Sequence, residues 1–566
     1  MREICRAFAF AVGAAISTQA VAQNYFTEQA LLFGRQMPGG SARIQAMGGA
    51  QVALGGDFSS ALSNPAGLGF YNRNEFSITP AITFINTNGN YNLYDGPVNN
   101  LTVTQTNSSA ATNQLSLPGL AIVFGAGKNT NQGAFYGGTF AITLNRVNDF
   151  NGSMQYSGQN QSSSIVQSFL ESAQGFTPNQ FNPLVNPTDR NIGPGDGDNV
   201  NTPEFLGFEN YLIGPIPTGV PSRDTIYFSD LAGGRPFQKE TIKTQGAQNQ
   251  WSLAYGANFS DKLFLGAGLG IMSVRYEYSK SYTEDFTGQS TGIYDTIQQR
   301  YSCVGCFNGM RLNESRSSSG NGINLSLGAI YKPIDFLQIG FNYTTPTSYQ
   351  MRDSYSGSMT TSWNNFEYYN NPVRPIPPPP RPRGPLNQEE SATIDDPVNY
   401  SLNTPSRLTV GLTVFVLKRG FVTAEIEQVN YANASTSSFS EQFNSPAKNP
   451  NRDINPIISS RFTSTTNIRV GAEYRWKNFR FRGGFNSMGN PYSNRPLNKV
   501  NYSLIDFFSV SGGIGYRTAK FFVDLAVVRS KGNGYYLPYS IDGYPAPHFN
   551  YEQVNSRIMF TVGIPF

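Results

Sequence analysis

Residues 555–566 of this 566-residue chain read NSRIMFTVGIPF. Apolar side chains occupy every second position from Ile558 to Phe566, and Met559, Thr561, Gly563 and Pro565 lie between them. Strict alternation places the apolar side chains on one face of a β-strand. An ordinary buried strand at a chain end has the same pattern, so the segments that precede it decide the fold.

Alternating segments of about 10 residues recur along the chain, and this is the length that a tilted strand needs to cross the hydrocarbon layer of a membrane. The clearest are residues 251–259, 408–414 and 468–476, with aromatic residues at the segment ends, as membrane-interface girdles require. Fourteen segments fit, at about residues 75–86, 114–126, 133–147, 248–260, 263–279, 320–332, 336–347, 406–417, 420–432, 464–476, 478–488, 507–518, 520–531 and 555–566.

The connections between these segments alternate between short and long. Tight, mostly charged turns lie at residues 260–262, 332–335, 418–419, 477–478 and 519–520, and every other connection is longer. In bacterial barrels the short turns face the periplasm and the long loops face outside. We therefore predict an all-β fold, a 14-stranded antiparallel transmembrane β-barrel. The barrel is expected to cover residues 74–566, with its largest extracellular loops at about 150–247 and 350–404.

Composition supports a barrel and argues against several other classes of protein. Charged residues make up 14% of the chain, against roughly 25% in soluble domains, whereas Gly (57), Phe (41) and Tyr (31) are abundant. A helical membrane protein would need about 20 consecutive apolar residues per span, and the predicted mature chain has no such run. One histidine, His548, and a net charge of +4 argue against His-based catalysis, metal sites and nucleic-acid binding. We expect neither enzyme activity nor a cofactor.

The N-terminus predicts export. Arg2 and Arg6 flank a short basic region before the apolar residues 7–16, and residues 20–22 (Ala-Val-Ala) have the pattern of a signal peptidase site. Residues 1–22 are therefore predicted to be a signal peptide. At the other end, the alternating strand that ends on Phe566 resembles the C-terminal signature of bacterial outer-membrane barrels. The two ends predict a barrel in the outer membrane of a Gram-negative bacterium, and we expect a monomer surrounded by outer-membrane lipid.

The block before the first strand is rich in small residues. Residues 42–81 read ARIQAMGGAQVALGGDFSSALSNPAGLGFYNRNEFSITPA, and small residues suit a segment inside a barrel lumen, where its backbone must approach the wall. Within the block, Asn64, Pro65, Ala66 and Gly67 form a turn motif that either belongs to a plug or simply leads into a strand. The block resembles the N-terminal hatch and Asn-Pro-Ala motif of the FadL/TodX family, outer-membrane transporters of long-chain fatty acids and other hydrophobic compounds. Residues 23–73 are accordingly expected to form a lumenal hatch.

The resemblance implies a mechanism. In this family a plug fills the barrel, the ligand binds inside, and a kink in the third strand opens a lateral gap to the membrane beside the Asn-Pro-Ala region. The third predicted strand contains Gly137 and Gly138, and a glycine pair inside a strand often marks a bulge or break. These two residues are the lateral-gate candidates for passive uptake of a hydrophobic small molecule. Some relatives, the PorV-like proteins of type IX secretion, use a similar barrel as an attachment scaffold, so secreted or surface proteins are the alternative partners.

The inward faces of the tenth and eleventh predicted strands carry arginines that could bind a ligand carboxylate through bidentate hydrogen bonds. These candidates are Arg469, Arg475, Arg480 and Arg482. Carboxylates on nearby strands could instead pair with them in a lumenal ion-pair ladder, which is the commoner arrangement: Glu425, Glu427, Glu473 and Asp524. On the fifth strand, Gly266, Gly268 and Gly270 leave a bare inner wall with space for a plug or a ligand.

Two short amphipathic helices are predicted in the first long loop. They are residues 162–173, with Gly175 as a stop, and a segment capped by Thr202 with Pro203 at its first position. They either form an apolar entry groove or pack on the base of the loop. In the other long loop, residues 372–385 are predicted to be a polyproline II spacer.

Cys303 and Cys306 are predicted to form a disulfide. Both reach an oxidising compartment, and no histidine lies nearby to complete a zinc site. A free or redox-active pair is the alternative. Two other motifs fail on inspection: residues 125–128 lack the upstream glycine of a phosphate loop, and residues 196–198 lack the later ligands of a calcium loop.

Overall fold

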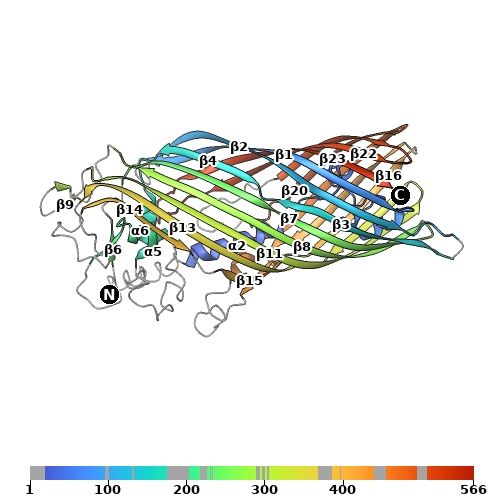
Figure 1. Ribbon diagram of the computed structural model, residues 1–566, viewed down its shortest axis with the longest axis horizontal. Helices are drawn as coiled ribbons and strands as arrows, with labels where there is room; N and C mark the ends of the chain where they lie inside the picture. Colours follow the sequence, from blue (N-terminus) through green and yellow to red (C-terminus); the bar gives the residue numbers. More distant parts are fainter. Residues whose placement is uncertain are drawn as a thin grey trace.

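The computed structural model describes residues 19–566 except 96–100, 131–132, 175–202, 217–225, 230, 232–233, 288–293, 296–299, 302–304, 367–384, 395–396, 418, 439–453, 494–506 and 543. The described chain forms a closed antiparallel β-barrel with the N-terminal segment inside it (Figure 1). The first strand, β1 (Glu75–Asp95), pairs with the last, β23 (His548–Pro565), and this pairing closes the sheet.

Fourteen strands make up the barrel wall, and they confirm all fourteen predicted segments and the predicted fold class. Successive strands pair antiparallel around the barrel, from β1 to β23. Between these two lie β2 (Thr102–Gly125), β3 (Phe135–Asp149), β7 (Phe237–Phe259), β8 (Leu263–Asp285), β11 (Phe307–Ile334), β12 (Leu337–Thr344), β16 (Arg407–Val416), β17 (Gly420–Asn430), β19 (Ser464–Trp476), β20 (Phe479–Met488), β21 (Phe507–Arg517) and β22 (Phe522–Tyr536).

The outward side chains of the wall form an apolar band. Leu325 on β11, Val410 on β16 and Ile468 on β19 are 53%, 48% and 45% exposed. The residues that alternate with them along each strand face the lumen and are buried. At the end with short turns, Trp476 stacks on Phe479 with ring centroids 6.2 Å apart. A closed barrel with an outward apolar band and interfacial aromatics is the form in which strands cross a membrane. No helix among the described residues is long and apolar enough to do so.

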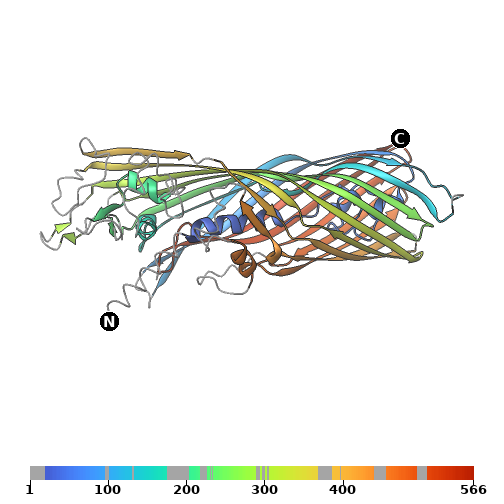
Figure 2. The ribbon, with the colours of Figure 1, turned by 90° about the horizontal axis from the view of Figure 1, so that it is seen from below.

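Several strands continue far beyond the apolar band, so part of what the sequence predicted as outer loop is strand (Figure 2). On β8, exposed Arg275 and Glu277 follow the last outward apolar residue, Ile271. The outward positions there carry polar side chains, and the apolar alternation that marks the membrane strands is lost. The segments 150–247 and 350–404 also contain strands of their own: β4 (Gly152–Gln159), β5 (Gly214–Ile216), β6 (Ile226–Phe228), β13 (Ser348–Phe366), β14 (Leu386–Ile394) and β15 (Val398–Asn403).

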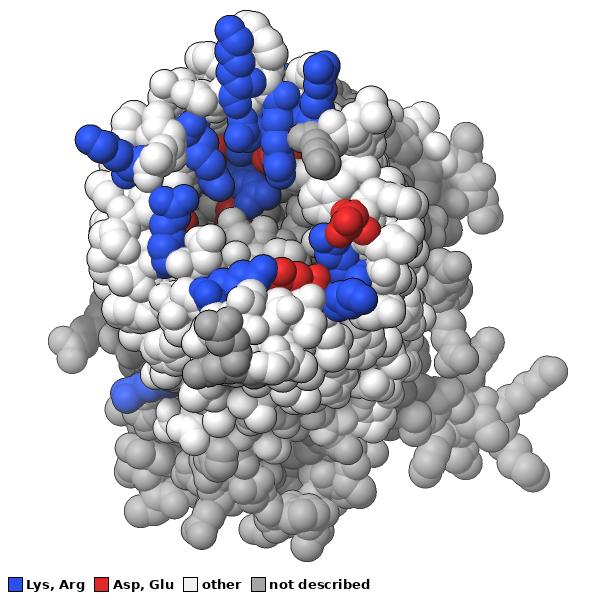
Figure 3. All heavy atoms as spheres, turned by 90° about the vertical axis from the view of Figure 1, so that its right-hand side faces the viewer, with Lys and Arg blue, Asp and Glu red and all other residues white. Residues whose placement is uncertain are grey.

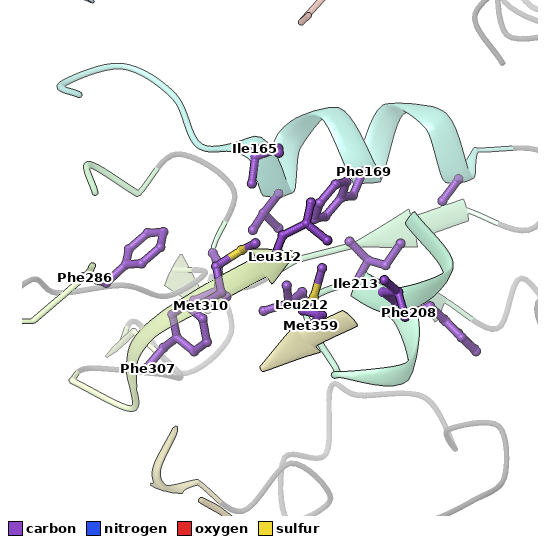
Figure 4. Packing of buried hydrophobic residues seen from close by; sticks show 14 of the residues in the cluster. Ile165, Phe169, Phe208, Leu212, Ile213, Phe286, Phe307, Met310, Leu312 and Met359 are labelled. Atoms are coloured by element: carbon purple, nitrogen blue, oxygen red, sulfur yellow. The ribbon is translucent and has the colours of Figure 1, made fainter. Parts of the chain in front are cut away.

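The extended strands enclose a hydrophobic core outside the membrane (Figure 4). Helices α5 (Ile165–Ala173) and α6 (Pro203–Glu209) confirm the two predicted helices, and their predicted flanking residues Gly175 and Thr202 lie outside the described residues. Phe169 and Leu206 are buried against Leu312 of β11, which favours packing over an open groove. The predicted proline spacer lies almost wholly outside the described part. The remaining short elements are β9 (Tyr294–Asp295), β10 (Arg300–Tyr301), η4 (Tyr431–Asn433), β18 (Ser435–Ser438) and α7 (Asn455–Arg461).

From Gln19, where the described chain begins, the N-terminal segment lies inside the barrel and contains four helices: α2 (Gln19–Gly34), α3 (Ala42–Gln45), α4 (Ser60–Ser63) and η1 (Pro65–Phe70). The sequence analysis missed α2, which Figures 1 and 2 both place within the strands. Its Ala30 and Phe33 are fully buried. The predicted cleavage site after Ala22 falls within this helix, and the cleavage itself stays a prediction.

Candidate functional site: the hatch and the lumen wall

The hatch, residues 41–70, takes its shape from local capping and from glycine turns. Ser41 caps α3 by accepting a hydrogen bond from the Ile44 backbone nitrogen (3.3 Å). Gly48 and Gly49 adopt φ of +70° and +82°, a region that favours glycine, and they turn the chain after α3. Nearly all residues from 41 to 70 are buried. The helix cap and the glycine turn therefore give the hatch a defined, compact conformation inside the lumen.

The Asn-Pro-Ala motif joins the hatch to itself and to the wall. The Asn64 side-chain oxygen accepts from the Ala66 nitrogen (3.1 Å), which caps η1, and Pro65 occupies the first turn. The Asn64 amide nitrogen donates to the Val52 carbonyl (2.6 Å) and to the Ala329 carbonyl of β11 (3.3 Å). Asn64 is fully buried, so each end of its amide needs these partners.

The wall lacks side chains where this motif approaches it. A Cβ atom on Gly266 of β8 would lie 2.3 Å from the Ala66 nitrogen, and one on Gly268 would lie 3.3 Å from Pro65 Cγ. These two glycines therefore make room for the hatch. Gly270 differs, because the space beside it is filled by side chains of neighbouring strands. Other wall glycines whose Cβ would approach hatch backbone closely are Gly256, Gly340, Gly471 and Gly484, and one on Gly328 would meet the Asn64 side chain.

Polar contacts hold the rest of the hatch to several wall strands. The Glu425 carboxylate of β17 accepts hydrogen bonds from the backbone nitrogens of Gln51 and Val52, each at 2.8 Å. Buried Arg43 of α3 lies 3.4 Å from Glu473 of β19. Further around the wall, the Ala42 nitrogen donates to Thr561 Oγ1 of β23 (2.8 Å). Apolar contacts add to these, since Phe58 and Leu68 of the hatch are buried in one cluster with Ala254 of the wall.

Three of the four candidate arginines are paired with lumenal carboxylates. Arg469 donates to Glu425 (2.6 Å) and Glu427 (2.9 Å). Arg482 donates to Glu473 (2.8 Å) and Asp524 (2.6 Å), and its side chain is 1% exposed.

The other two candidates lie nearer the short turns. Arg475 donates to Glu473 (2.9 Å) but keeps a side chain that is 39% exposed. Arg480 donates to the carbonyls of Lys477 and Phe479. The buried pairs fit the ion-pair ladder, and a role of the four arginines in binding a ligand carboxylate stays a prediction.

Two small cavities lie between the hatch and the wall. One, of ≈ 80 Å³, is lined by hatch residues such as Val52 and by Arg469. The other, of ≈ 90 Å³, is lined by Pro38, Arg146 and Arg557. Ligand pockets usually measure roughly 300 Å³ or more, so neither cavity holds more than a few water molecules. Passage of a ligand along this part of the lumen therefore requires the hatch to move.

Gly137 and Gly138 form a bulge, but the wall is paired around them. The register between β3 and β7 shifts between Phe135 and Gly137, and Gly137 has a φ of +136°. Gly138 pairs with Ala257 of β7, and its carbonyl accepts from the Ala126 nitrogen (3.2 Å). A Cβ on Gly138 would meet the Tyr255 hydroxyl, which belongs to the outward face. The role of Gly137 and Gly138 in a lateral gate stays a prediction.

The pairing between β2 and β3 stops part of the way along both strands. Their ladder runs from Gly125 and Thr139 to Gly119 and Asn145 and goes no further in the described chain. Beyond it, Thr102–Pro118 of β2 pairs with β1 alone, while β3 and β4 continue along β7. We call this interruption the seam.

Side chains bridge the seam where backbone pairing is lacking. With its amide oriented so that both ends are satisfied, Gln114 donates to both Asp149 oxygens (2.9 Å each) and accepts from Asn151 (2.8 Å) and Arg146 (3.1 Å). Asp149 also lies 3.6 Å from Arg557 of β23. Leu115 on the outer side of the seam is 80% exposed and pairs with Ile82, an outward residue of β1. The seam therefore lies at the level of the apolar band.

The predicted disulfide lies at the outer end. Cys306 is disulfide-bonded and belongs to the hydrophobic core outside the membrane. Cys303 lies outside the described residues, so its pairing with Cys306 stays a prediction.

A closed, lipid-facing wall around a hydrogen-bonded hatch defines a plugged transmembrane β-barrel. The structure is similar to a FadL homologue from Pseudomonas aeruginosa (14% identity, TM-score 0.47) and to the toluene transporter TodX from P. putida (13%, 0.43), covering 94% of this chain and 99% of each of those chains. It is also similar to the toluene transporter TbuX from Ralstonia pickettii (14%, 0.39), covering 94% of this chain and 99% of that one. No family model and no curated protein matches the sequence.

Proposed function

We propose that this protein is an outer-membrane channel for passive uptake of hydrophobic compounds, such as long-chain fatty acids or similar molecules. The observation that carries the proposal is the plugged barrel itself. An open lumen of this size would leak polar solutes, and the hatch fills it with backbone that is hydrogen-bonded to the wall. A seal of this kind serves controlled passage and has no use in a purely structural barrel.

The seam supports a lateral exit from the lumen into the membrane. An unpaired backbone at membrane depth is costly unless other groups satisfy it. Here side chains join the two unpaired edges, chiefly through the contacts of Gln114 with Asp149 and Asn151. Side chains rotate more easily than a β-ladder separates, so the seam can open without unfolding the wall. Exposed Leu115 and Leu117 on its outer side offer an apolar surface to a molecule that leaves there.

A reversible cross-link tests this route. Gln114→Cys combined with Asp149→Cys places two thiols across the seam, and a short bifunctional thiol reagent then closes it. The matched control is Ala121→Cys with Thr143→Cys, which are paired residues in the regular β2–β3 ladder. Uptake of toluene, a neutral probe, is measured in cells that lack the native gene and express each variant. We expect cross-linking to reduce uptake severalfold only in the seam variant, with recovery after reduction.

Equal uptake before and after cross-linking of the seam would overturn the lateral route. The wider proposal is tested by deleting the gene and measuring both hydrocarbon or fatty-acid uptake and the proteins at the cell surface. Normal uptake together with lost surface proteins would overturn the transport function and favour a secretion scaffold.

A further inference from the structure

The end of the barrel with the short turns carries more arginines than carboxylates. Arg475 on β19, Arg480 on β20 and Arg517 on β21 occupy the lumen-facing register at the ends of three consecutive strands. We call these three residues the arginine arc. Figure 3 looks onto this end and shows Lys and Arg side chains around the rim with few acidic ones. Exposed Arg419, Lys477 and Lys520 lie in the adjacent turns.

The arc contains a like-charge pair that the fold does not require. Arg475 and Arg480 lie directly opposite each other across β19 and β20, and like charges at such positions destabilise a sheet. Glu473 is the carboxylate beside them, at 2.9 Å from Arg475. It is also shared with Arg482 (2.8 Å) and Arg43 (3.4 Å). Glu473 is therefore shared by three guanidinium groups, of which Arg482 and Arg43 each have a second carboxylate, Asp524 and Asp57.

Two members of the arc have no carboxylate partner. In the part of the chain that the structure describes, no carboxylate lies within 4 Å of the guanidinium of Arg480 or Arg517. Arg482, which lies further inside the lumen on β20, has two carboxylate partners. Arg480 uses Nη1 for the carbonyls of Lys477 (2.7 Å) and Phe479 (2.9 Å). A guanidinium has five N–H donors, so most of those on Arg480 remain for another acceptor.

Aromatic rings accompany the excess charge. The Arg517 guanidinium lies 4.5 Å from the ring centroid of Phe522, and that of Arg475 lies 5.7 Å from Phe421. Both rings face the lumen, on β22 and β17. Such contacts hold the guanidinium planes in place while their edges stay available for hydrogen bonds. The mouth thus presents guanidinium groups that are held in orientation by buried rings, which suits the binding of an anionic headgroup.

We propose that the arginine arc binds the carboxylate or phosphate headgroup of an amphiphile that has passed through the lumen, and releases it toward the periplasm. This inference rests on the proposed uptake function. A neutral hydrocarbon can leave through the seam, but a charged headgroup pays a large desolvation penalty in the apolar band. The arc offers that headgroup a charged route at the other end of the lumen. Guanidinium groups are suited to binding such a headgroup, because they bind carboxylates and phosphates bidentately.

The test compares two probes with the same chain and different headgroups, sodium decanoate and 1-decanol. Binding of each is measured by equilibrium dialysis to the full-length protein in phosphatidylcholine nanodiscs at low salt, with empty nanodiscs as blank. The variant is Arg480→Gln with Arg517→Gln. Because Arg480 also holds a turn, Arg517→Gln with Arg419→Gln is the second variant. Arg275→Gln, an exposed arginine far from the mouth, is the matched control.

We expect wild type and Arg275→Gln to bind decanoate about tenfold more tightly than the arc variants, since hydrogen bonds to charged groups contribute this much. Decanol binding should be equal in all four proteins. Decanol binding without any preference for decanoate, or a preference that survives in both arc variants, would overturn the arc and leave the uptake function standing. Loss of the preference when phosphatidylglycerol is added to the nanodiscs would mean that the arc binds the headgroup of a membrane lipid. It would overturn the proposal that the bound amphiphile arrives through the lumen. Binding of neither probe to wild type would overturn the uptake function itself.

Discussion

Arg469 on β19 donates to Glu425 on β17 at 2.6 Å, and through this pair the lumen wall holds the hatch. The second oxygen of Glu425 accepts from the backbone nitrogens of Gln51 and Val52 at 2.8 Å each. Both oxygens of this buried carboxylate are therefore used, one for the wall and one for the plug. Small changes at Glu425 are expected to affect the seal before they affect the barrel.

The first prediction concerns Glu425→Ala. The change leaves two hatch N–H groups without acceptors and removes one partner of Arg469, and breaking a buried pair in this way costs about 3–5 kcal/mol. The hatch should loosen, because the wall strands keep their own backbone ladders. We expect increased permeability to small polar solutes in liposome-swelling assays, with normal barrel assembly.

The matched control for this prediction is Glu277→Ala, which removes an exposed carboxylate above the membrane. This variant should show the permeability of wild type. A sealed Glu425→Ala barrel would show that the hatch does not depend on this contact.

The second prediction uses the glycines of the wall. A methyl group on Gly266 would lie 2.3 Å from the Ala66 nitrogen, which is backbone and cannot rotate away. Gly266→Ala should displace η1 and increase leakage. Gly512→Ala is the control, since its nearest neighbour, the Arg482 carbonyl oxygen, would be at 3.7 Å, an ordinary contact. Equal leakage of the two variants in single-channel recordings would contradict the proposed fit between hatch and wall.

The sequence predicted the barrel strands well because lipid imposes a strict rule on them. Residues 468–476 must show apolar side chains at every second position, and this rule can be seen without any knowledge of their neighbours. The outer parts of β2 and β11 obey no such rule, because both their faces can be polar. They were consequently predicted as loops.

The site was predicted less completely, because its contacts join distant parts of the chain. The composition of residues 42–68 identified the hatch, and the bare wall at Gly266 could be seen from its own alternation. The bridge from Gln114 to Asp149 had no such signal, since neither residue is unusual in its strand. The glycine pair at 137–138 correctly indicated a bulge, but a bulge on one edge does not show whether the neighbouring strand has separated.

The third prediction separates structural from ligand-binding arginines. Arg482 lies between Glu473 and Asp524 with a side chain that is 1% exposed. Arg482→Met leaves two buried carboxylates without their shared partner, a change that costs about 3–5 kcal/mol. We expect a lower midpoint for urea unfolding in detergent, whereas Arg529→Met, at an exposed position on β22, should leave the midpoint unchanged. An unchanged midpoint for Arg482→Met would show that the ladder does not stabilise this barrel.

The last prediction is the disulfide between Cys303 and Cys306. Cys306 is disulfide-bonded and 7% exposed, in the core formed by the extended strands and α5. The third cysteine of the chain, Cys5, belongs to the predicted signal peptide. Protein purified from the membrane without reductant and denatured should therefore take up no alkylating reagent, and after reduction it should take up two labels per chain.

Reduction should change the fold little, because the bond closes a very short loop. In the chain-entropy estimate a loop of this size contributes about 2 kcal/mol, and the surrounding aromatic packing, such as Phe307 on Trp363 at 4.7 Å, does not depend on it. Far-UV circular dichroism and the midpoint of urea unfolding should therefore stay close to their values before reduction. Two labels on the unreduced protein would show that the thiols are free and would contradict the predicted pair.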